Sequence, residues 1–459
     1  MAALCQLLLL TLAIGLGSCV RYEADWDSLD TRPLPTWYDD AKIGIFIHWG
    51  IFSVPSYGLP DDDGSRYPGG QGAVGEWFWK RWNVIEARSP FFSFRLEQTI
   101  SQYIFIYFFL PGAKYIVLTS KHHEGYTLWP SKYSWNWNSM DVGAKRDIVG
   151  ELAKAIRNNT DLTFGLYHSL YEWFHPMYLE DKANNFQTNE FVLTKTLPEL
   201  YEIVNEYGPE VIFSDGDWES DSTYFNSTIF LAWLFNDSPV KDTIVVNDRW
   251  GKDATCKHGS YLTCTDRYNP GTLQSQKWEN ALTFDRYSWG FRRNANMDDY
   301  LSIEDTLEQL ISTISCGGNM LINIGPTKEG MLPAIMEERL LQMGEWLDIN
   351  GEGIYASKPW THQNDTLTPG VWYTSKNDKV YAFVLDWPAG SKLVLGSVKS
   401  TETTSVTILG QNGETLKVVE AGNGLEVTFP PMSQVKSKWS WVLELTGVQA
   451  NPRAHQLWR

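Results

Sequence analysis

Three acidic residues follow one short apolar run of the chain. Residues 210–220 read EVIFSDGDWES, so Asp215 ends the run and Asp217 and Glu219 come just after it. A carboxylate at the end of a buried strand costs free energy unless hydrogen-bond donors, a cation or a substrate interact with it. Asp215 is therefore the candidate catalytic residue, whereas we expect Asp217 and Glu219 in a turn or at the rim of the site.

Polar residues also end four other apolar runs. They are His48 and Trp49 in the first run, His122, His123 and Glu124 in the second, Tyr167 and His168 in the third, and Asn247, Asp248 and Arg249 in the fifth. The parallel strands of a barrel bring their carboxyl ends to one face, where barrel enzymes place their chemistry. Five runs with this kind of ending predict a single site.

Several kinds of catalytic site do not fit these residues. The histidine pair in KHHEG (121–125) lacks the H-E-x-x-H spacing and the C-x-x-C partner of zinc sites. No G-x-S-x-G motif supports a Ser-His-Asp triad, and GGQG (69–72) does not lie between a strand and a helix, as a phosphate-binding loop would. A pair of carboxylates among aromatic rings, histidines and an arginine instead suits glycoside hydrolysis. In that reaction one acid attacks the sugar or activates water, and the other protonates the leaving oxygen.

Short apolar runs alternate with helical patterns up to about residue 355. The runs are 43–50, 115–123, 162–169, 210–215, 243–251 and 319–326. Residues 145–157 and 302–316 have the spacing of amphipathic helices, the second with Ser302 as a candidate N-cap and a stop at Gly317. Repeated strand–helix units predict the α/β class with a parallel sheet. At this length they favour a (β/α)-barrel catalytic domain over residues 20–355.

The pattern changes after about residue 355. Short segments there alternate in period two, with Asn412–Gly413 and Asn423–Gly424 as turn signals. We therefore expect a separate antiparallel β-sandwich over residues 356–459.

The composition limits the choice of partners. The chain has 459 residues, 43% hydrophobic and 20% charged, which is typical of a globular protein with room for a large barrel and a second domain. With 55 acidic against 38 basic residues its net charge is −17, which argues against nucleic acid as a partner because nothing neutralises the phosphates. The 22 tryptophans fit stacking on sugars, although we expect most of these rings in the core.

The start of the chain has the features of a secretory protein. Residues 4–16 form an apolar run too short to span a bilayer, and small residues follow, which predicts a signal peptide over residues 1–19. No other stretch approaches the ~20 apolar residues of a membrane span, so we expect no membrane partner. Sequons for N-glycosylation begin at Asn158, Asn226 and Asn364 and fit the secretory route.

Cys256 and Cys264 lie eight residues apart in a loop-like stretch. Either they form a disulfide in an oxidising lumen or they stay unpaired in the core. In the first case Cys316 is left free.

Seven motifs spread along the chain form a specific set. They are IGIFIHWGIFSVPSYG (43–58), KYIVLTSKHHEG (114–125), GAKRDIVGEL (143–152), SDGDW (214–218), VVNDRWG (245–251), KWE (277–279) and GGNMLINIGPTKEG (317–330). Together they resemble the α-L-fucosidases, the vertebrate tissue and plasma types above all.

This resemblance implies a catalytic barrel followed by a β-sandwich, with no metal or organic cofactor. It also implies hydrolysis, with retention, of terminal α-linked L-fucose from glycoproteins, glycolipids and oligosaccharides. Fucosylated glycans are then the partners. The implied location is the lysosome, with secretion as the alternative, and a homo-oligomer is one option for the assembly.

The resemblance also implies roles for single residues. Asp215 matches the family's nucleophile. Asp266, by its position after Arg249, matches the acid/base, and Glu279 in KWE is the rival carboxylate. The implied fucose contacts are His48, Glu76, Trp77, His122, His123, Tyr167, Phe213 and Arg249.

General chemistry is consistent with these roles. Neutral histidines and Arg249 can donate to the sugar hydroxyls, and Trp77 can pack on the apolar face of the sugar. Arg249 next to Asp215 is expected to keep the nucleophile ionised, while the second acid is expected to have a raised pKa.

The chain departs from the family in four places. Phe213 stands where the family usually has a tryptophan, so the ring is kept and the indole N–H is lost. His168 takes the place of a tyrosine. Residues 59–75 have the character of an insertion and residues 81–110 resemble nothing in the family, so that 59–110 is an atypical segment. Because of this segment, the alternative function is a catalytically impaired fucose-binding protein.

Overall fold

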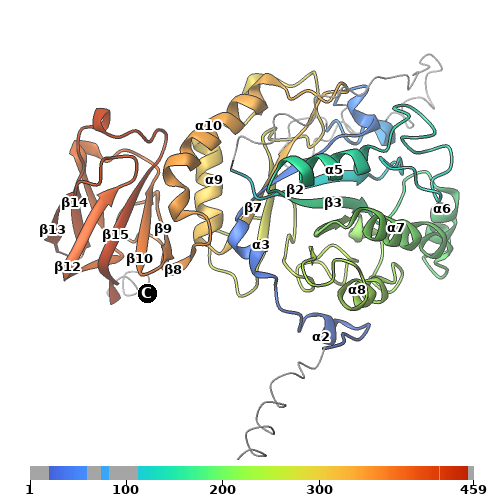
Figure 1. Ribbon diagram of the computed structural model, residues 1–459, viewed down its shortest axis with the longest axis horizontal. Helices are drawn as coiled ribbons and strands as arrows, with labels where there is room; N and C mark the ends of the chain where they lie inside the picture. The colour runs from blue at the N-terminus through green and yellow to red at the C-terminus, as the bar shows by residue number, and fades with distance from the viewer. Residues whose placement is uncertain (1–19, 59–73, 82–111, 423, 453–459) are drawn as a thin grey trace, which may run out of the picture.

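The computed structural model describes residues 20–58, 74–81, 112–422 and 424–452. The expected signal peptide, most of the atypical segment 59–110 and the turn residue Asn423 lie outside these residues. A parallel sheet surrounded by helices and a smaller body of antiparallel strands make up the described chain (Figure 1).

Seven parallel strands form the larger sheet, in the order β5-β4-β3-β2-β1-β7-β6. They are β1 (Ile43–Ile47), β2 (Tyr115–Lys121), β3 (Thr163–Ser169), β4 (Val211–Asp215), β5 (Val245–Val246), β6 (Trp278–Thr283) and β7 (Gly318–Ile324). Six of them lie in the apolar runs of the sequence. The pattern did not indicate β6, because Glu279 and Asn280 interrupt its apolar character.

The sheet curls until residues 260–262 connect its two edges. Ser260 N donates to Val246 O of β5 (2.9 Å), and Leu262 pairs in parallel with Trp278 of β6. Glu279 N then donates to Leu262 O (2.8 Å). The predicted barrel architecture is confirmed, with an irregular segment in place of regular pairing between β5 and β6.

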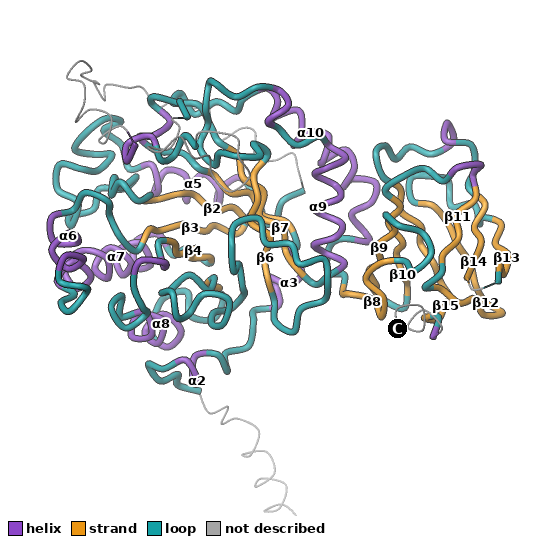
Figure 2. The backbone as a smooth tube through the Cα atoms, turned by 180° about the vertical axis from the view of Figure 1, so that it is seen from behind, coloured by secondary structure: helices purple, strands orange, loops and turns teal. Residues whose placement is uncertain are grey.

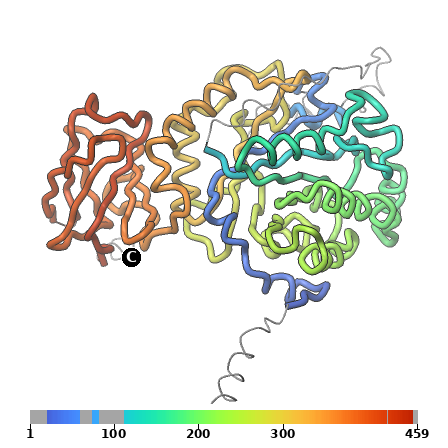
Figure 3. Tube along the Cα trace, viewed as in Figure 1, coloured from blue at the N-terminus to red at the C-terminus, as the bar shows by residue number. Residues whose placement is uncertain are grey.

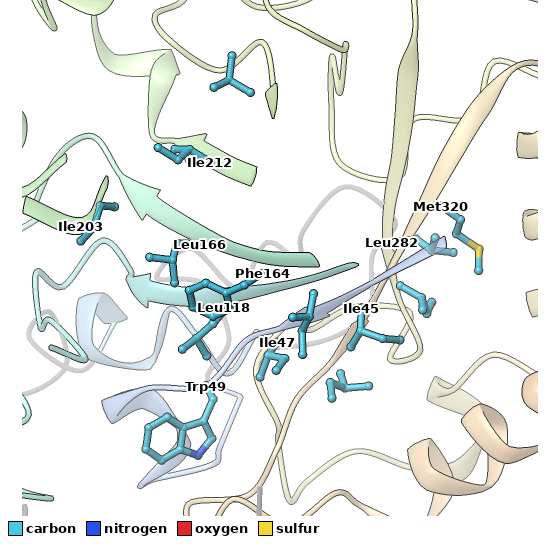
Figure 4. Packing of buried hydrophobic residues seen from close by; sticks show 14 of the residues in the cluster. Ile45, Ile47, Trp49, Leu118, Phe164, Leu166, Ile203, Ile212, Leu282 and Met320 are labelled. Atoms are coloured by element: carbon cyan, nitrogen blue, oxygen red, sulfur yellow. The ribbon is translucent and has the colours of Figure 1, made fainter. Parts of the chain in front are cut away.

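Strand residues alternate between the outside and the inside of the curled sheet. Outward residues such as Ile45, Leu118 and Leu282 pack against the helices in the main core (Figure 4). A second apolar cluster fills the inside and includes Phe46, Tyr115, Val117, Tyr167, Val211, Phe213, Ala281 and Leu321. This inner cluster forms the floor of the site described below.

The helices cover the outer face of the sheet. They are α2 (Trp26–Leu29), α3 (Thr36–Ala41), α5 (Ile148–Asn159), α6 (Pro176–Ala183), α7 (Leu197–Tyr207), α8 (Ser227–Asn236), α9 (Ile303–Ser315) and α10 (Ala334–Asn350). Both predicted helices are present as α5 and α9. Helix α5 begins three residues later than predicted because the Asp147 side chain accepts from Gly150 N (2.9 Å) and caps it. Ser302 caps α9 as predicted.

Antiparallel strands follow α10. They are β8 (Lys358–Asn364), β9 (Val371–Lys376), β10 (Lys379–Val384), β11 (Lys392–Leu395), β12 (Val398–Ile408), β13 (Lys417–Ala421), β14 (Gly424–Thr428) and β15 (Trp441–Ala450). A five-stranded sheet, β12-β15-β10-β9-β8, and a three-stranded sheet, β11-β14-β13, enclose an apolar core of their own. The predicted antiparallel sandwich is confirmed.

Helices α9 and α10 lie between the two bodies (Figure 2). Trp346 of α10 packs on Phe383 of β10, and its Nε1 donates to Ser440 O (3.0 Å). The colour gradient of Figure 3 shows that these helices and the antiparallel strands are consecutive parts of the chain. Across the described ranges, no helix has the length and apolar character needed to cross a membrane.

Candidate active site

A cavity of about 760 Å³ opens at the carboxyl ends of the parallel strands. All eight predicted sugar contacts line it, together with two of the three predicted catalytic carboxylates. These residues are His48, Glu76, Trp77, His122, His123, Tyr167, Phe213, Arg249, Asp215 and Asp266. The curled parallel sheet thus brings together residues that are far apart in the sequence.

One guanidinium bridges the two carboxylates. Arg249 Nη1 donates to Asp215 Oδ1 (3.0 Å), and Nη2 donates to Asp266 Oδ1 (2.8 Å). The Nε of Arg249 donates to Thr263 Oγ1 (3.1 Å). Asp215 ends β4 and Arg249 follows the neighbouring strand β5, so strand pairing brings them together, whereas Asp266 comes from the long loop between β5 and β6.

The bridge determines the charges of these groups. Burial acts to lower the pKa of Arg249, but Asp266 and Asp215 raise that pKa well above its ordinary value. Burial acts to raise the pKa of Asp266, but the ion pair with Arg249 outweighs burial and lowers that pKa. The expectation that the second acid has a raised pKa is therefore wrong for this arrangement, because the same arginine pairs with both carboxylates.

The second oxygen of Asp215 faces two more side chains. Tyr167 Oη donates to Asp215 Oδ2 (2.8 Å), and His123 Nε2 lies 3.5 Å from the same oxygen. Burial lowers the pKa of His123 well below its ordinary value, so its ring is neutral. The Ser169 hydroxyl donates to Tyr171 O (2.7 Å), so its oxygen accepts from His123 Nδ1 (2.6 Å), and the proton of the neutral ring is on Nδ1. Two donors, Tyr167 Oη and Arg249 Nη1, thus converge on Asp215 and stabilise its negative charge.

His48 has the same tautomer. Its Nδ1 lies 2.7 Å from Asn323 Oδ1, and the Asn323 amide donates both hydrogens, to Thr283 Oγ1 (3.0 Å) and Trp289 O (2.8 Å). Because a carbonyl only accepts, these contacts fix the amide, and His48 Nδ1 must be the donor to Oδ1. Burial lowers the pKa of His48 to about 3, so Nε2 carries a lone pair. His48 therefore accepts a hydrogen bond through Nε2 instead of donating one, contrary to our expectation.

Residues 74–81 supply another wall of the cavity. Glu76 Oε2 accepts from the backbone N–H groups of Trp289 (3.2 Å) and Gly290 (3.0 Å), and burial raises the pKa of Glu76. The ring of Trp77 packs against Trp173 with 5.1 Å between centroids. The first contact fixes an acidic group in the wall, and the second fixes an apolar ring.

Phe213 and His168, two of the departures from the family, have different surroundings. The Phe213 ring belongs to the inner cluster, and the guanidinium carbon of Arg249 lies 5.3 Å from its centroid. His168 follows Tyr167 in β3 and therefore points to the opposite face. There it is buried, with Nε2 3.3 Å from Glu199 Oε2.

Glu279, the rival carboxylate, is not among the described residues that line the cavity. It is the second residue of β6, near the amino end of the strand, whereas the cavity opens at the carboxyl ends. Its Oε2 accepts from Tyr38 Oη (2.7 Å) and Tyr115 Oη (2.6 Å). The side chain is fully buried, and burial raises the pKa of Glu279 to about 7.

The carboxylates after Asp215 lie in the short helix η5 (Asp217–Glu219). Asp217 is buried and lines the cavity, deeper than expected, and the Thr255 hydroxyl donates to it. Glu219 does not line the cavity and pairs with Lys182 (2.5 Å). Between them, Trp218 lines the cavity with 44% of its surface exposed.

Two residues that hold histidines were not assigned to the site from the sequence. Asn323 orients His48, and Glu124 Oε2 lies 3.1 Å from His122 Nδ1. For Glu124 the sequence left two possibilities, capping a helix or holding a histidine, and the structure shows the second. The polar Asn323 inside the apolar run 319–326 was a signal that could have indicated its role.

The remaining sequence predictions concern cysteines and sequons. Cys256 and Cys264 form a disulfide, and Cys316 is free and buried. The sequon asparagines Asn158 and Asn364 are exposed, and Asn226 is half-buried. Their glycosylation stays a prediction.

Comparison with known protein families gives two matches. The model described as "Alpha-L-fucosidase" matches residues 16–103 and 105–352, and the one described as "Alpha-L-fucosidase C-terminal domain" matches residues 363–446. The first match includes the atypical segment apart from residue 104.

The chain is also similar to single proteins over nearly its whole length. "Plasma alpha-L-fucosidase" of Homo sapiens is 51% identical over 455 residues, which cover 94% of this chain and 94% of that protein. "Tissue alpha-L-fucosidase" of Homo sapiens is 47% identical over 470 residues, 96% of this chain and 97% of that protein. The crystal structure of Thermotoga maritima alpha-fucosidase in complex with a mechanism based inhibitor superposes with a TM-score of 0.77 at 31% identity. The superposed region covers 93% of this chain and 100% of the Thermotoga maritima chain.

Proposed function

Because this chain belongs to the α-L-fucosidase family, we propose that it hydrolyses terminal α-L-fucose from glycoproteins, glycolipids and oligosaccharides with retention of configuration. The observation that carries the proposal is the pair of carboxylates, Asp215 and Asp266, held by one guanidinium in a cavity lined by histidines and aromatic rings. A retaining glycosidase needs two carboxyl groups only ~5 Å apart. A single guanidinium that contacts both keeps them close.

Asp215 is the nucleophile in this proposal. Its oxygen forms a bond to the anomeric carbon of fucose while the bond from that carbon to the leaving oxygen breaks, which gives a glycosyl ester. Arg249 and Tyr167 stabilise the carboxylate before the reaction and again when it is released.

Asp266 is the acid/base. In the first step its proton moves to the leaving oxygen. In the second step Asp266 takes a proton from water, whose oxygen attacks the anomeric carbon and releases Asp215. To act as the acid, Asp266 must first be protonated, whereas its ion pair with Arg249 favours the carboxylate. A sugar hydroxyl that accepts a hydrogen bond from Arg249 Nη2 would weaken the ion pair between the guanidinium and Asp266. Burial, which favours the neutral acid, would then raise the pKa of Asp266.

Fucose binding uses both kinds of hydrogen-bonding group in the cavity. His48 Nε2 accepts from one sugar hydroxyl, and the carboxyl of Glu76 is placed to interact with another. Arg249 donates. The ring of Trp77 offers an apolar surface to the C–H face and the methyl group of the sugar.

The test is an aryl α-L-fucoside assay with the wild type and the Asp215→Ala variant. We expect turnover by the wild type, loss of roughly 10³-fold or more in Asp215→Ala, and partial recovery with azide, which replaces the missing nucleophile. A wild type that binds fucose without turnover would refute the proposal and leave a fucose-binding protein.

A second assay separates Asp266 from Glu279. Asp266→Ala is expected to lose activity on substrates with poor leaving groups and to keep much of it when the leaving group needs no proton. Glu279→Ala should not show this selective recovery. The opposite pattern would assign the acid to Glu279.

Relatives named for plasma and for tissue favour the secretory route for this chain, ending in the lysosome or outside the cell. Of these two we propose the lysosome. Expression of the full chain in cultured cells, followed by fractionation and assay of the medium, tests this. Activity found in the medium alone would favour secretion.

A further inference from the structure

A buried carboxylate next to the site has no part in the reaction described above. Asp248 precedes Arg249 and is fully buried, yet its two oxygens accept four hydrogen bonds. Oδ1 accepts from Thr263 N (2.9 Å) and Thr263 Oγ1 (2.5 Å), and Oδ2 accepts from Cys256 N (2.7 Å) and Cys264 N (3.0 Å). All four donors belong to the loop that carries Asp266.

The Thr263 hydroxyl links Asp248 to the catalytic arginine. A hydroxyl has one proton, and here it is donated to Asp248, so a lone pair of the same oxygen accepts from Arg249 Nε (3.1 Å). With Nε bound in this way, the guanidinium is oriented with Nη1 toward Asp215 and Nη2 toward Asp266. Asp248 therefore determines, through Thr263, where the cation lies.

Asp248 also holds the backbone of the loop. The N–H of Cys264, two residues before Asp266, and the N–H of Cys256 meet at the same oxygen. The disulfide joins the same two residues, which have positive φ angles of 60° and 48°. Since non-glycine residues adopt such angles at a cost, the four hydrogen bonds and the disulfide offset that cost.

We propose that Asp248 is a positioning residue for the acid/base, acting through the Thr263 hydroxyl on Arg249 and through two backbone N–H groups on the Asp266 loop. This inference relies on the proposed role of Asp266. Only a carboxylate can accept four hydrogen bonds at this place, because an asparagine would turn an NH₂ group toward two of the donors. Loss of the network should impair protonation of the leaving group more than attack by Asp215.

The test compares Thr263→Val, which keeps the shape of the side chain and removes the hydroxyl, with Thr263→Ser, which keeps the hydroxyl. Each variant is assayed on an alkyl α-L-fucoside, whose leaving group needs a proton, and on α-L-fucosyl fluoride, whose leaving group is good. We expect Thr263→Val to lower kcat/KM for the alkyl substrate by roughly 10- to 100-fold more than for the fluoride. This factor corresponds to the loss of one hydrogen bond to a charged group. Thr263→Ser should restore the wild-type ratio.

Asp248→Asn should change the same ratio in the same direction, and it should move the basic limb of the pH profile, which reports ionisation of the acid. The matched control is Asp253→Asn. Asp253 accepts from Ser222 N (2.6 Å) and Ser222 Oγ (2.8 Å), so it also anchors this loop, but it does not line the cavity. Its variant should leave the substrate ratio unchanged.

Each outcome has a distinct meaning. Suppose that Thr263→Val folds and lowers kcat/KM equally for both substrates, or for neither. Asp248 and Thr263 then have only a structural role, and the inference is wrong. If the wild type hydrolyses neither substrate, the proposed function itself fails.

Discussion

Glu279→Gln separates a structural carboxyl from a catalytic one through the pH dependence of stability. Glu279 is fully buried, and its only described hydrogen-bond donors are the hydroxyls of Tyr38 and Tyr115 on Oε2. Its other oxygen has no hydrogen-bond partner among the described residues. Two donors do not compensate for the loss of water around a charge, so the folded protein binds the proton more tightly than the unfolded chain.

The size of the effect follows from the pKa of this group. Burial raises the pKa of Glu279 from 4.5 to about 7. Between these two values the folded state holds a proton that the unfolded state has released, so the free energy of unfolding falls as the pH rises. At ~1.4 kcal/mol per pH unit, the total loss is about 3 kcal/mol. The stability from this group is complete below pH 4.5 and is lost as the pH passes 7.

Glutamine resembles the protonated acid and does not titrate. We expect the wild type to lose about 3 kcal/mol relative to Glu279→Gln between pH 4 and pH 8. Urea unfolding followed by tryptophan fluorescence at several pH values measures the difference. Glu190→Gln, at an exposed position, is the control and should show no such trend.

A stability difference that stays constant from pH 4 to pH 8 would refute the reasoning, because Glu279 would then titrate equally in both states. Activity gives a second check. Since Glu279 does not line the cavity, Glu279→Gln should keep its kcat/KM within a few-fold and its leaving-group dependence unchanged. A large loss that only good leaving groups repair would place the acid here instead of at Asp266.

Three further predictions concern the surroundings of the catalytic pair. Arg249→Lys should lower kcat/KM by roughly 10²-fold or more in the fucoside assay, because a lysine cannot replace a guanidinium that contacts three groups at once; near-normal activity would show that the bridge is dispensable. Replacement of both Cys256 and Cys264 by serine should lower the free energy of unfolding by about 2 kcal/mol, as expected for a short closed loop, measured by urea unfolding; an unchanged midpoint would contradict it. Trp218→Ala should raise KM for fucosyl disaccharides several-fold and leave α-L-fucosyl fluoride unaffected, because its exposed ring at the cavity can contact the leaving sugar. Trp135→Ala, 85% exposed and not part of the cavity lining, is the control, and equal effects of the two variants would refute this role.

Local sequence pattern predicted the larger part of this architecture for a physical reason. Apolar runs with polar ends, such as the one that ends at Asp215, are what a buried parallel strand requires, because its middle has no access to water and its end reaches the site. The strand β6 was missed by the same reasoning. Glu279, which points inward, and Asn280, which points outward to Thr313 of α9, are polar and find their partners only in the folded interior.

The sequence by itself determined that the residues at the strand ends meet at the mouth of the parallel sheet, since the strands share one direction. Only the tertiary structure decided how those residues act. The tautomer of His48 depends on Asn323, and the charge of Asp266 depends on an arginine that also pairs with Asp215. The position of Glu279 depends on which end of β6 it occupies. These properties depend on distances between residues far apart in the chain, and spacing along the sequence does not encode those distances.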